Sequence, residues 1–236
     1  MSAEKSPETR ERILRAAARL LAEGGSEALS TRAVCAAAGV QAPTLYRVFG
    51  DKDGLLDAVA GYGFERYLAE KHSLAPTEDP VEDLRRGWDM HVDFGLTHPA
   101  FYVLMYGTVR PGHRPAAAED AYALLRAMLE RTARAGRLRI PVDAAAQTIQ
   151  ATSAGVTLAL ISSPADARDR GLSVRVRDTV LASVTTEARP AAPASGDAVP
   201  VHALALNAAL GDRPTALGST ETVLLREWLE RLATSE

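Results

Sequence analysis

Cysteine is almost absent from this sequence, which has a single one, Cys35, among 236 residues. One thiol cannot form an intramolecular disulfide, so no disulfide framework supports the fold. Cys35 lies on the apolar face of a predicted helix, and we expect it to behave as a small buried apolar residue. A redox-sensing thiol is the alternative interpretation.

Aromatic residues are also few, at 5% of the chain, and no segment longer than a few residues shows the alternating pattern of a β-strand. Ala, Leu and Arg dominate the composition, which favours helices over sheets. Hydrophobic residues make up 47% of the chain, which excludes disorder of the whole chain. The sequence therefore predicts an all-α protein with one large or two small domains.

Long apolar runs and targeting signals are missing as well. The longest apolar stretch, 142–161, is interrupted by Gln147, Gln150 and several hydroxyl groups, so we predict no membrane span. Residues 1–7 are charged and short, unlike a signal peptide. We therefore expect a cytoplasmic protein.

Motifs of catalysis and cofactor binding are missing too. The sequence has no G-x-S-x-G, no phosphate-binding loop and no H-E-x-x-H. Gly61 and Gly63 lie inside a predicted helix and do not form a dinucleotide fingerprint. His91 and His98 would be two helical turns apart, about 10 Å of rise, which is too far to share one ion. We therefore predict no catalytic residues, no cofactor and no metal site.

What the sequence does contain is a pair of short helices about a tight turn, between Ser30 and Phe49. Ser30 is suited to cap the first helix, because its side-chain oxygen can accept a bond from an unpaired backbone N–H. Gly39 is suited to end that helix in the left-handed conformation. Pro43 is tolerated in the first turn of the second helix, which begins near Gln41 or Ala42. Such a pair is the arrangement that places its second helix in the DNA major groove.

The second helix of the pair has two distinct faces. Leu45, Val48 and Phe49 recur at i, i+3 and i+4 and should point inward. The outward residues are small, hydrogen-bonding or cationic, which suits the major groove. These outward residues are Gln41, Ala42, Thr44, Tyr46 and Arg47.

Charge is distributed unevenly along the chain. The net charge is −3, but residues 9–52 contain seven basic and four acidic residues, a local surplus of +3. A surplus of this size suits a few placed phosphate contacts better than a broad basic patch.

From about Thr9 to Ala60 the sequence resembles the TetR family of transcriptional regulators. RERILRAAARLLAEGG resembles the family's first helix, and LSTRAVCAAAGVQAPTLYRVFGDKDGLLDAV resembles its helix-turn-helix and the start of its fourth helix. The family core T-L-Y-x-x-F is present as Thr44, Leu45, Tyr46 and Phe49, with Lys52 three residues later.

Two positions depart from the family pattern. Gln41 stands where the family usually has Ser or Thr, which leaves the second helix less well capped and Gln41 free to read a base. Gly54 lies in the first turn of the fourth helix, where a better helix former is usual. Beyond about residue 70 the resemblance is architectural only.

The resemblance implies a ligand-responsive repressor that binds a palindromic double-stranded DNA operator as a homodimer and is released by a small-molecule effector. It implies an N-terminal three-helix helix-turn-helix DNA-binding domain in residues 1–50, a connecting helix in 51–72 and a larger helical effector-binding and dimerisation domain in 78–236. The positions that match the family's DNA contacts are Thr31, Arg32, Gln41, Ala42, Thr44, Tyr46, Arg47 and Lys52. The alternative is an all-helical protein-interaction module without operator binding.

Helical periodicity and breakers predict the remaining helices. The first helix starts at Ser6 and is stopped by Gly24 and Gly25. A long helix follows Asp51 and runs to about Lys71. The later helices are predicted at 81–97, 100–106, 116–137, 142–162, 173–188, 201–210 and 219–233.

Five of the chain's twelve Phe, Trp and Tyr residues lie between residues 88 and 106. Large apolar surfaces with a few polar tips are typical of a small-molecule pocket, and an ordinary core is the alternative. Two glutamines of helix 142–162 would add polar contacts to a largely apolar effector. The predicted ligand-binding residues are Trp88, His91, Phe94, Phe101, Tyr102, Met105, Tyr106, Gln147 and Gln150.

Helix 142–162 carries small residues at i, i+4 and i+8, namely Ala151, Gly155 and Ala159. Such a stripe lets another helix approach closely. We interpret it as a symmetric dimer seam with helix 173–188 or the last helix, and internal packing is the alternative.

Overall fold

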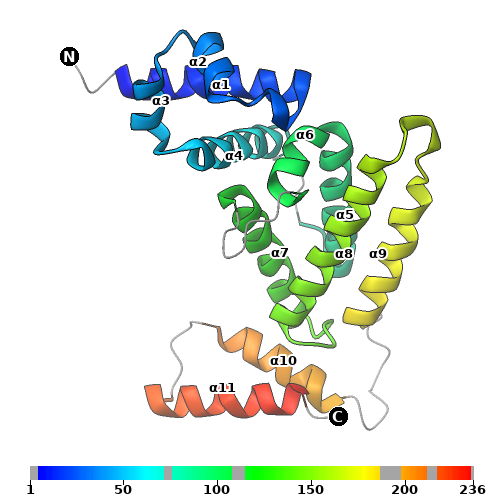
Figure 1. Cartoon of the computed structure of the whole chain (residues 1–236). Coiled ribbons are helices and arrows are strands. Elements are labelled where there is room, and N and C mark those ends of the chain that lie inside the picture. The colour runs from blue at the N-terminus through cyan, green and yellow to red at the C-terminus, as the bar shows by residue number, and fades with distance from the viewer. Residues whose placement is uncertain (1–4, 72–75, 108–114, 187–197, 212–216, 235–236) are drawn as a thin grey trace. The chain divides into compact units, whose positions relative to one another are not determined.

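The computed structural model describes residues 5–71, 76–107, 115–186, 198–211 and 217–234 (Figure 1). The helices are α1 (Lys5–Gly24), α2 (Thr31–Ala38), α3 (Ala42–Phe49), α4 (Lys52–Lys71), α5 (Pro80–Thr97), α6 (Pro99–Tyr102), α7 (Ala116–Arg134), α8 (Val142–Ser162), α9 (Arg170–Val184), α10 (Ala198–Leu210) and α11 (Ser219–Thr234). Within these ranges extended backbone pairs at one isolated antiparallel bridge, Leu138 with Thr185. The predicted all-α fold is confirmed.

The helices form two compact units. Unit 1 comprises residues 1–74 and 93–121, and unit 2 comprises residues 75–92 and 122–236. Helices α5 and α7 each contribute residues to both units. The functional division into a DNA-binding domain, a connecting helix and an effector domain stays a prediction.

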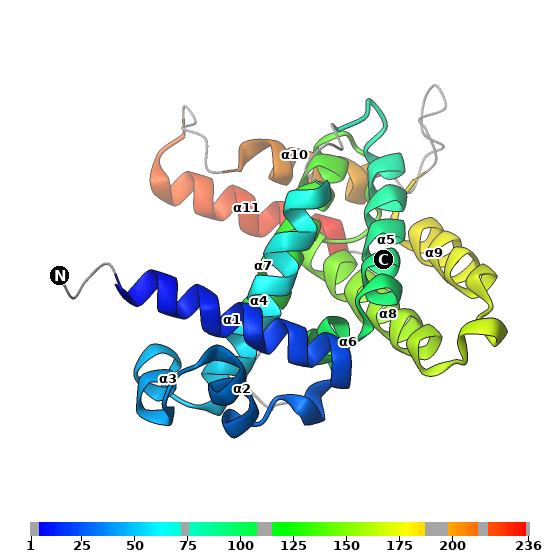
Figure 2. The same cartoon turned by 90° about the horizontal axis from the view of Figure 1, so that it is seen from above.

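In unit 1, α1 packs against α2, α3 and α4, and Figure 2 shows α1 beside α2 and α3. Ile13, Ala17 and Leu21 recur on one face of α1 and are fully buried. Leu45 of α3 and Leu55 of α4 are fully buried as well. This shared core holds the two-helix pair, which alone would bury too little apolar surface to be stable.

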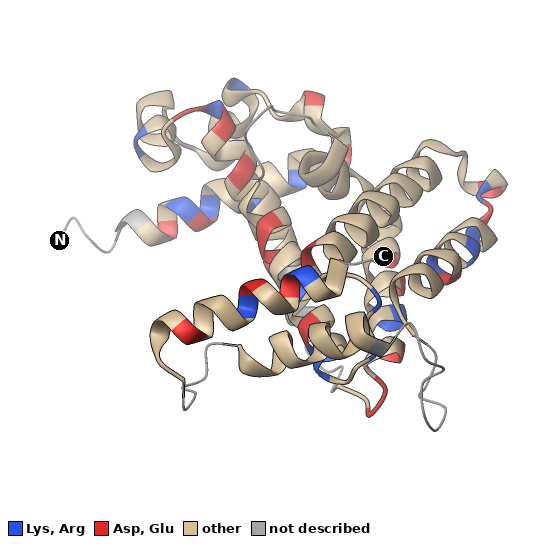
Figure 3. Cartoon of the chain, turned by 90° about the horizontal axis from the view of Figure 1, so that it is seen from below, with Lys and Arg blue, Asp and Glu red and all other residues tan. Residues whose placement is uncertain are grey.

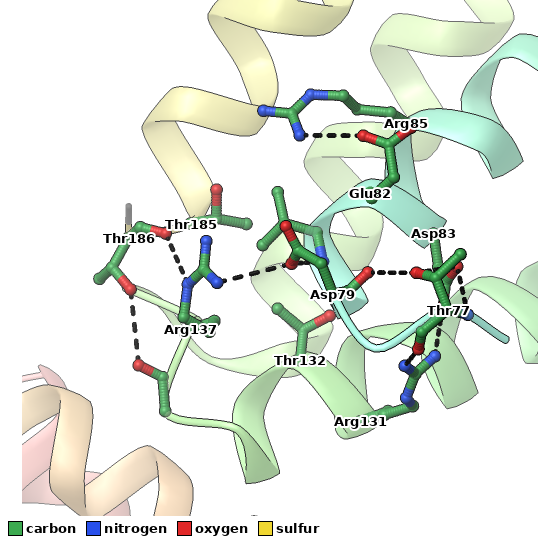
Figure 4. A network of polar contacts seen from close by, with 12 residues as sticks. Thr77, Asp79, Glu82, Asp83, Arg85, Arg131, Thr132, Arg137, Thr185 and Thr186 are labelled. Carbon is green, nitrogen blue, oxygen red and sulfur yellow. Dashed lines mark hydrogen bonds and ion pairs between the residues drawn. The ribbon is translucent and has the colours of Figure 1, made fainter. Parts of the chain in front are cut away.

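In unit 2, a polar network joins segments that are far apart in the sequence (Figure 4). Asp83, in the first turn of α5, accepts hydrogen bonds from the N–H and hydroxyl of Thr77 at 3.0 and 2.8 Å, and from the guanidinium of Arg131. Arg137 donates through Nε to the carbonyl oxygen of Thr186 at 3.0 Å. The network therefore connects the segment before α5, the end of α7 and the segment after α9.

Several predicted helices have different bounds in the structure; the one predicted at 116–137, for example, ends at Arg134. The helix predicted at 173–188 begins earlier, where Asp169 accepts a bond from the N–H of Gly171, and it ends at Val184. Residues 185–186 are extended because their backbone pairs with residues 137–139 instead of continuing the helix. The helix predicted at 100–106 is α6 followed by a π-helical turn, Val103–Gly107.

Helices α10 and α11 pack against each other around a small core of Ala203, Leu204, Leu229 and Ala233. Other apolar side chains of α11 are exposed, among them Trp228, which is 51% exposed. The predicted helix at 201–210 is three residues longer in the structure, since it begins at Ala198.

Candidate nucleic-acid interface

The turn between α2 and α3 forms as the sequence predicts. Ser30 Oγ accepts a hydrogen bond from the N–H of Ala33 at 3.1 Å and caps α2. Gly39 has a φ of 63° and ends α2 in the left-handed conformation, which glycine adopts without a Cβ penalty. Gln41 stands at the N-cap of α3 without a side-chain bond to the backbone, and Pro43 lies in the first turn.

Helix α3, which we call the reading helix, has the two faces expected from its sequence. Leu45 is fully buried, and Val48 and Phe49 are half-buried. On the other face Gln41, Tyr46 and Arg47 are exposed, with Tyr46 at 44%, and Ala42 and Thr44 are half-buried. The reading helix therefore presents amide, phenol and guanidinium groups to solvent, with a fully buried Leu45 behind them.

The predicted DNA contacts outside the reading helix lie at the starts of α2 and α4. Thr31 and Arg32 open α2, with Arg32 exposed and Thr31 half-buried. Lys52 opens α4 and is exposed. Asp51 Oδ1 accepts a bond from the N–H of Gly54 at 2.7 Å and caps α4. First-turn N–H groups and a cation together suit a phosphate.

The charges of unit 1 are mixed in sign. Figure 3 shows Lys and Arg interspersed with Asp and Glu along α1. Arg15 pairs with Glu11 at 3.4 Å, and both side chains are exposed. This arrangement agrees with the small local surplus of +3 in residues 9–52, and it favours discrete phosphate contacts.

Three glycines of α4 have different surroundings. A Cβ at Gly54 would lie 2.1 Å from the carbonyl oxygen of Phe49, and a Cβ at Gly63 would lie 2.2 Å from the ring of Phe101. A Cβ at Gly61 would meet nothing within 4 Å. Close packing therefore accounts for two of the glycines, and the structure gives no packing reason for Gly61.

The predicted ligand-binding residues fall into both units. In unit 1, Phe94, Phe101, Tyr102 and Met105 are buried and Tyr106 is half-buried. The rings of Tyr102 and Tyr106 are 4.7 Å apart, and those of Phe94 and Tyr102 are 6.2 Å apart. Phe64 of α4, which the sequence did not single out, meets Phe94 edge to face at 6.1 Å. Nothing near Phe64 in the sequence could have indicated this contact.

In unit 2, Trp88 is buried and donates through Nε1 to Ser173 Oγ of α9 at 3.0 Å. Burial lowers the pKa of His91 to about 4, so its imidazole is neutral at pH 7. Gln147 is exposed and Gln150 is half-buried. The structure thus brings Phe94, Tyr102 and Tyr106 together, and it gives Trp88 a separate partner on α9.

The small residues of α8 are exposed in the single chain. The opposite face of α8 is buried, and α8 packs against α9 in the same chain. The exposed residues are Ala151, Gly155 and Ala159, together with Gln147 one turn earlier. Intrachain packing therefore leaves this stripe uncovered in the described residues.

Cys35 is buried, as expected for a small apolar residue. Among the described residues, no three His, Cys, Asp or Glu side chains gather where they could hold a metal ion. Across the same ranges every helix is too short or too polar to traverse a lipid bilayer.

Comparison with known proteins identifies relatives of this chain. Residues 13–59 match the family model of bacterial regulatory proteins, tetR family. The tetracycline repressor protein class C of Escherichia coli is 32% identical over 167 residues, which cover 69% of this chain and 70% of that protein. The transcriptional regulator UidR of Escherichia coli K12 is 33% identical over 107 residues, 43% of this chain and 48% of that protein.

A solved structure supports the same relationship. A TetR variant from Acinetobacter baumannii AYE, in complex with minocycline, is 26% identical, with a TM-score of 0.53, over 72% of this chain and 93% of that chain. Together with the helix-turn-helix geometry of α2 and α3, these relatives show that the chain belongs to the tetR family of bacterial transcriptional regulators.

Proposed function

We propose that this regulator is a repressor that binds a palindromic operator as a homodimer and is released by a small-molecule effector. The observation that carries the proposal is the reading helix, which exposes Gln41, Tyr46 and Arg47 over a fully buried Leu45. Two such helices in a dimer would lie about 34–36 Å apart, one turn of DNA. The operator should therefore be a palindrome with half-sites one turn apart.

In this proposal, residues of the reading helix read bases while flanking residues hold the backbone. Gln41, Ala42, Thr44 and Arg47 would face base edges or nearby phosphates. Tyr46 and Lys52 would contact phosphates, as would Thr31 and Arg32 at the start of α2. Exposure of Gln41, Tyr46, Arg47, Arg32 and Lys52 supports these roles.

Selection of binding sites from random duplex DNA tests the proposal directly. An enriched palindrome is the expected result. The absence of an enriched palindrome would favour the alternative, a helical protein-interaction module.

Gel shifts on the recovered operator then test the residue roles. Tyr46→Ala and Lys52→Ala should weaken binding to every duplex, because phosphate contacts carry no sequence information. Arg47→Ala should also change the preferred bases. The control is Arg134→Ala, an exposed arginine of α7. If the three test variants bind like this control, the assignment is wrong.

The effector would bind among the aromatic residues of the sequence-predicted set. Support comes from the burial of Phe94, Phe101 and Tyr102 and from the ring contacts between Phe94, Tyr102 and Tyr106. The related TetR variant was crystallised with minocycline. A coupling free energy of about 1–3 kcal/mol between the effector site and the DNA-binding surface would lower DNA affinity about 5- to 150-fold when the effector binds.

A further inference from the structure

We propose that Arg12 of α1 is a positioning residue for DNA recognition, which acts on the reading helix through the end of α2. The inference rests on the proposed function. Arg12 Nε donates a hydrogen bond to the carbonyl oxygen of Ala38 at 3.0 Å, across 26 residues of sequence. Ala38 is the last residue of α2.

The end of α2 has a specific need for this donor. The N–H groups of Gly39 and Val40 bond to the carbonyls of Ala36 and Cys35, at 3.3 and 3.0 Å. This is the Schellman pattern, which satisfies two of the carbonyls that a helix end leaves open. The carbonyl of Ala38 lies beyond that pattern, and Arg12 supplies its donor. A guanidinium there also faces the negative end of the α2 dipole.

The position of this bond connects it to the reading helix. Gly39, Val40 and Gln41 separate Ala38 from the first residue of α3. Gln41 makes no side-chain cap, so the start of α3 is held by backbone bonds from Thr44 and Leu45 to the Gln41 carbonyl. A change in the direction of the Ala38 carbonyl would therefore alter the path of the three residues that lead into the eight-residue α3.

Neighbouring cations of α1 have different partners. Arg15 pairs with Glu11 of the same helix, with both side chains exposed. Arg10 lies over the ring of Phe49 at 5.9 Å, a cation–π contact at an exposed residue. Arg12 instead bonds to the backbone of the turn-bearing helix. This bond distinguishes Arg12 from a residue that contributes only its positive charge to the surface of α1.

Two substitutions separate positioning from a phosphate contact. Arg12→Gln removes the charge but keeps an N–H donor on the atom bonded to Cδ, where Arg has its Nε. Arg12→Met has a side chain of comparable length and removes both charge and donor. If Arg12 positions the turn, Arg12→Gln should retain operator binding and Arg12→Met should lose it. If Arg12 contacts a phosphate, both variants should be equally weak.

The measurement is the affinity of each variant for the selected operator and for a scrambled duplex at several salt concentrations. We expect Arg12→Met to bind the operator about tenfold more weakly than the native protein, and to bind the scrambled duplex unchanged. Arg12→Gln should stay within about threefold on the operator. The slope of log affinity against log salt should not change, whereas each lost phosphate contact would reduce it by about one.

The control is Arg15→Gln, which removes the same charge from the same helix without touching α2 and should bind like the native protein. Titration of each variant with saturating operator measures the fraction of the protein that can bind DNA. A variant that has only lost stability will still bind the operator more tightly than the scrambled duplex. Equal weakness of Arg12→Gln and Arg12→Met, or a reduced salt slope, would overturn the positioning role. Failure of the native protein to select any palindrome would instead overturn the proposed function.

Discussion

A single carboxylate, Asp83, connects three segments of unit 2. Burial alone would raise the pKa of Asp83, but hydrogen bonds from Arg131 and Thr77 and the charge of Arg131 outweigh it and hold that pKa below 3.8. The side chain is only 12% exposed, so water screens these contacts weakly. The ionised carboxylate therefore contributes to the stability of unit 2.

Asp83→Asn should lower the free energy of unfolding by about 1–3 kcal/mol at pH 7, because the charge-assisted bond from Arg131 is lost. Since the folded-state pKa lies below 3.8, this contribution is present above pH 3.8 and is lost as the pH falls through the folded-state pKa. Urea unfolding at pH 7 and near pH 3 measures both effects. The adjacent Glu82→Gln, which breaks an exposed pair with Arg85, should cost about 0–1 kcal/mol; equal effects of the two variants would contradict the prediction.

Among the elements, α4 combines two glycines that should respond in opposite ways. At Gly63 a methyl group would collide with the buried ring of Phe101, 2.2 Å away, whereas at Gly61 nothing lies within 4 Å. Gly63→Ala should destabilise the protein by about 1–3 kcal/mol through overpacking. Gly61→Ala should stabilise it by up to about 1 kcal/mol through helix propensity. Thermal unfolding of both variants is the measurement, and a stabilised Gly63→Ala protein would show that α4 and α6 do not pack this closely.

For the whole molecule, the exposed stripe on α8 predicts how two chains associate. Gly155→Trp places a large ring where small residues would let a partner helix approach. We expect the native protein to sediment as a dimer and the variant to sediment as a monomer. Ala127→Trp, at an exposed position of α7, is the control and should remain dimeric. A Gly155→Trp protein that keeps the native sedimentation coefficient would place the seam elsewhere.

The helix-turn-helix could be predicted from the sequence because its signals are local. The Ser30 cap, the left-handed Gly39 and the apolar spacing around Leu45 each act within one helical turn, and the structure has all three. Helix bounds were less predictable where distant segments competed. Residues 185–186 do not continue α9 because the backbone there bonds to residues 137–139. No pattern within four residues of sequence predicts a partner so distant in the chain.

The sequence by itself determined that the chain is helical, where its helix-turn-helix lies and which family it resembles, since propensity, capping and periodicity involve residues within about one turn of each other. Only the tertiary structure decided which distant side chains meet: Arg12 with Ala38, Gly63 with Phe101, and Trp88 with Ser173. Those contacts span 26 to 85 residues of chain. Their partners are chosen by how whole helices pack, which no local pattern encodes.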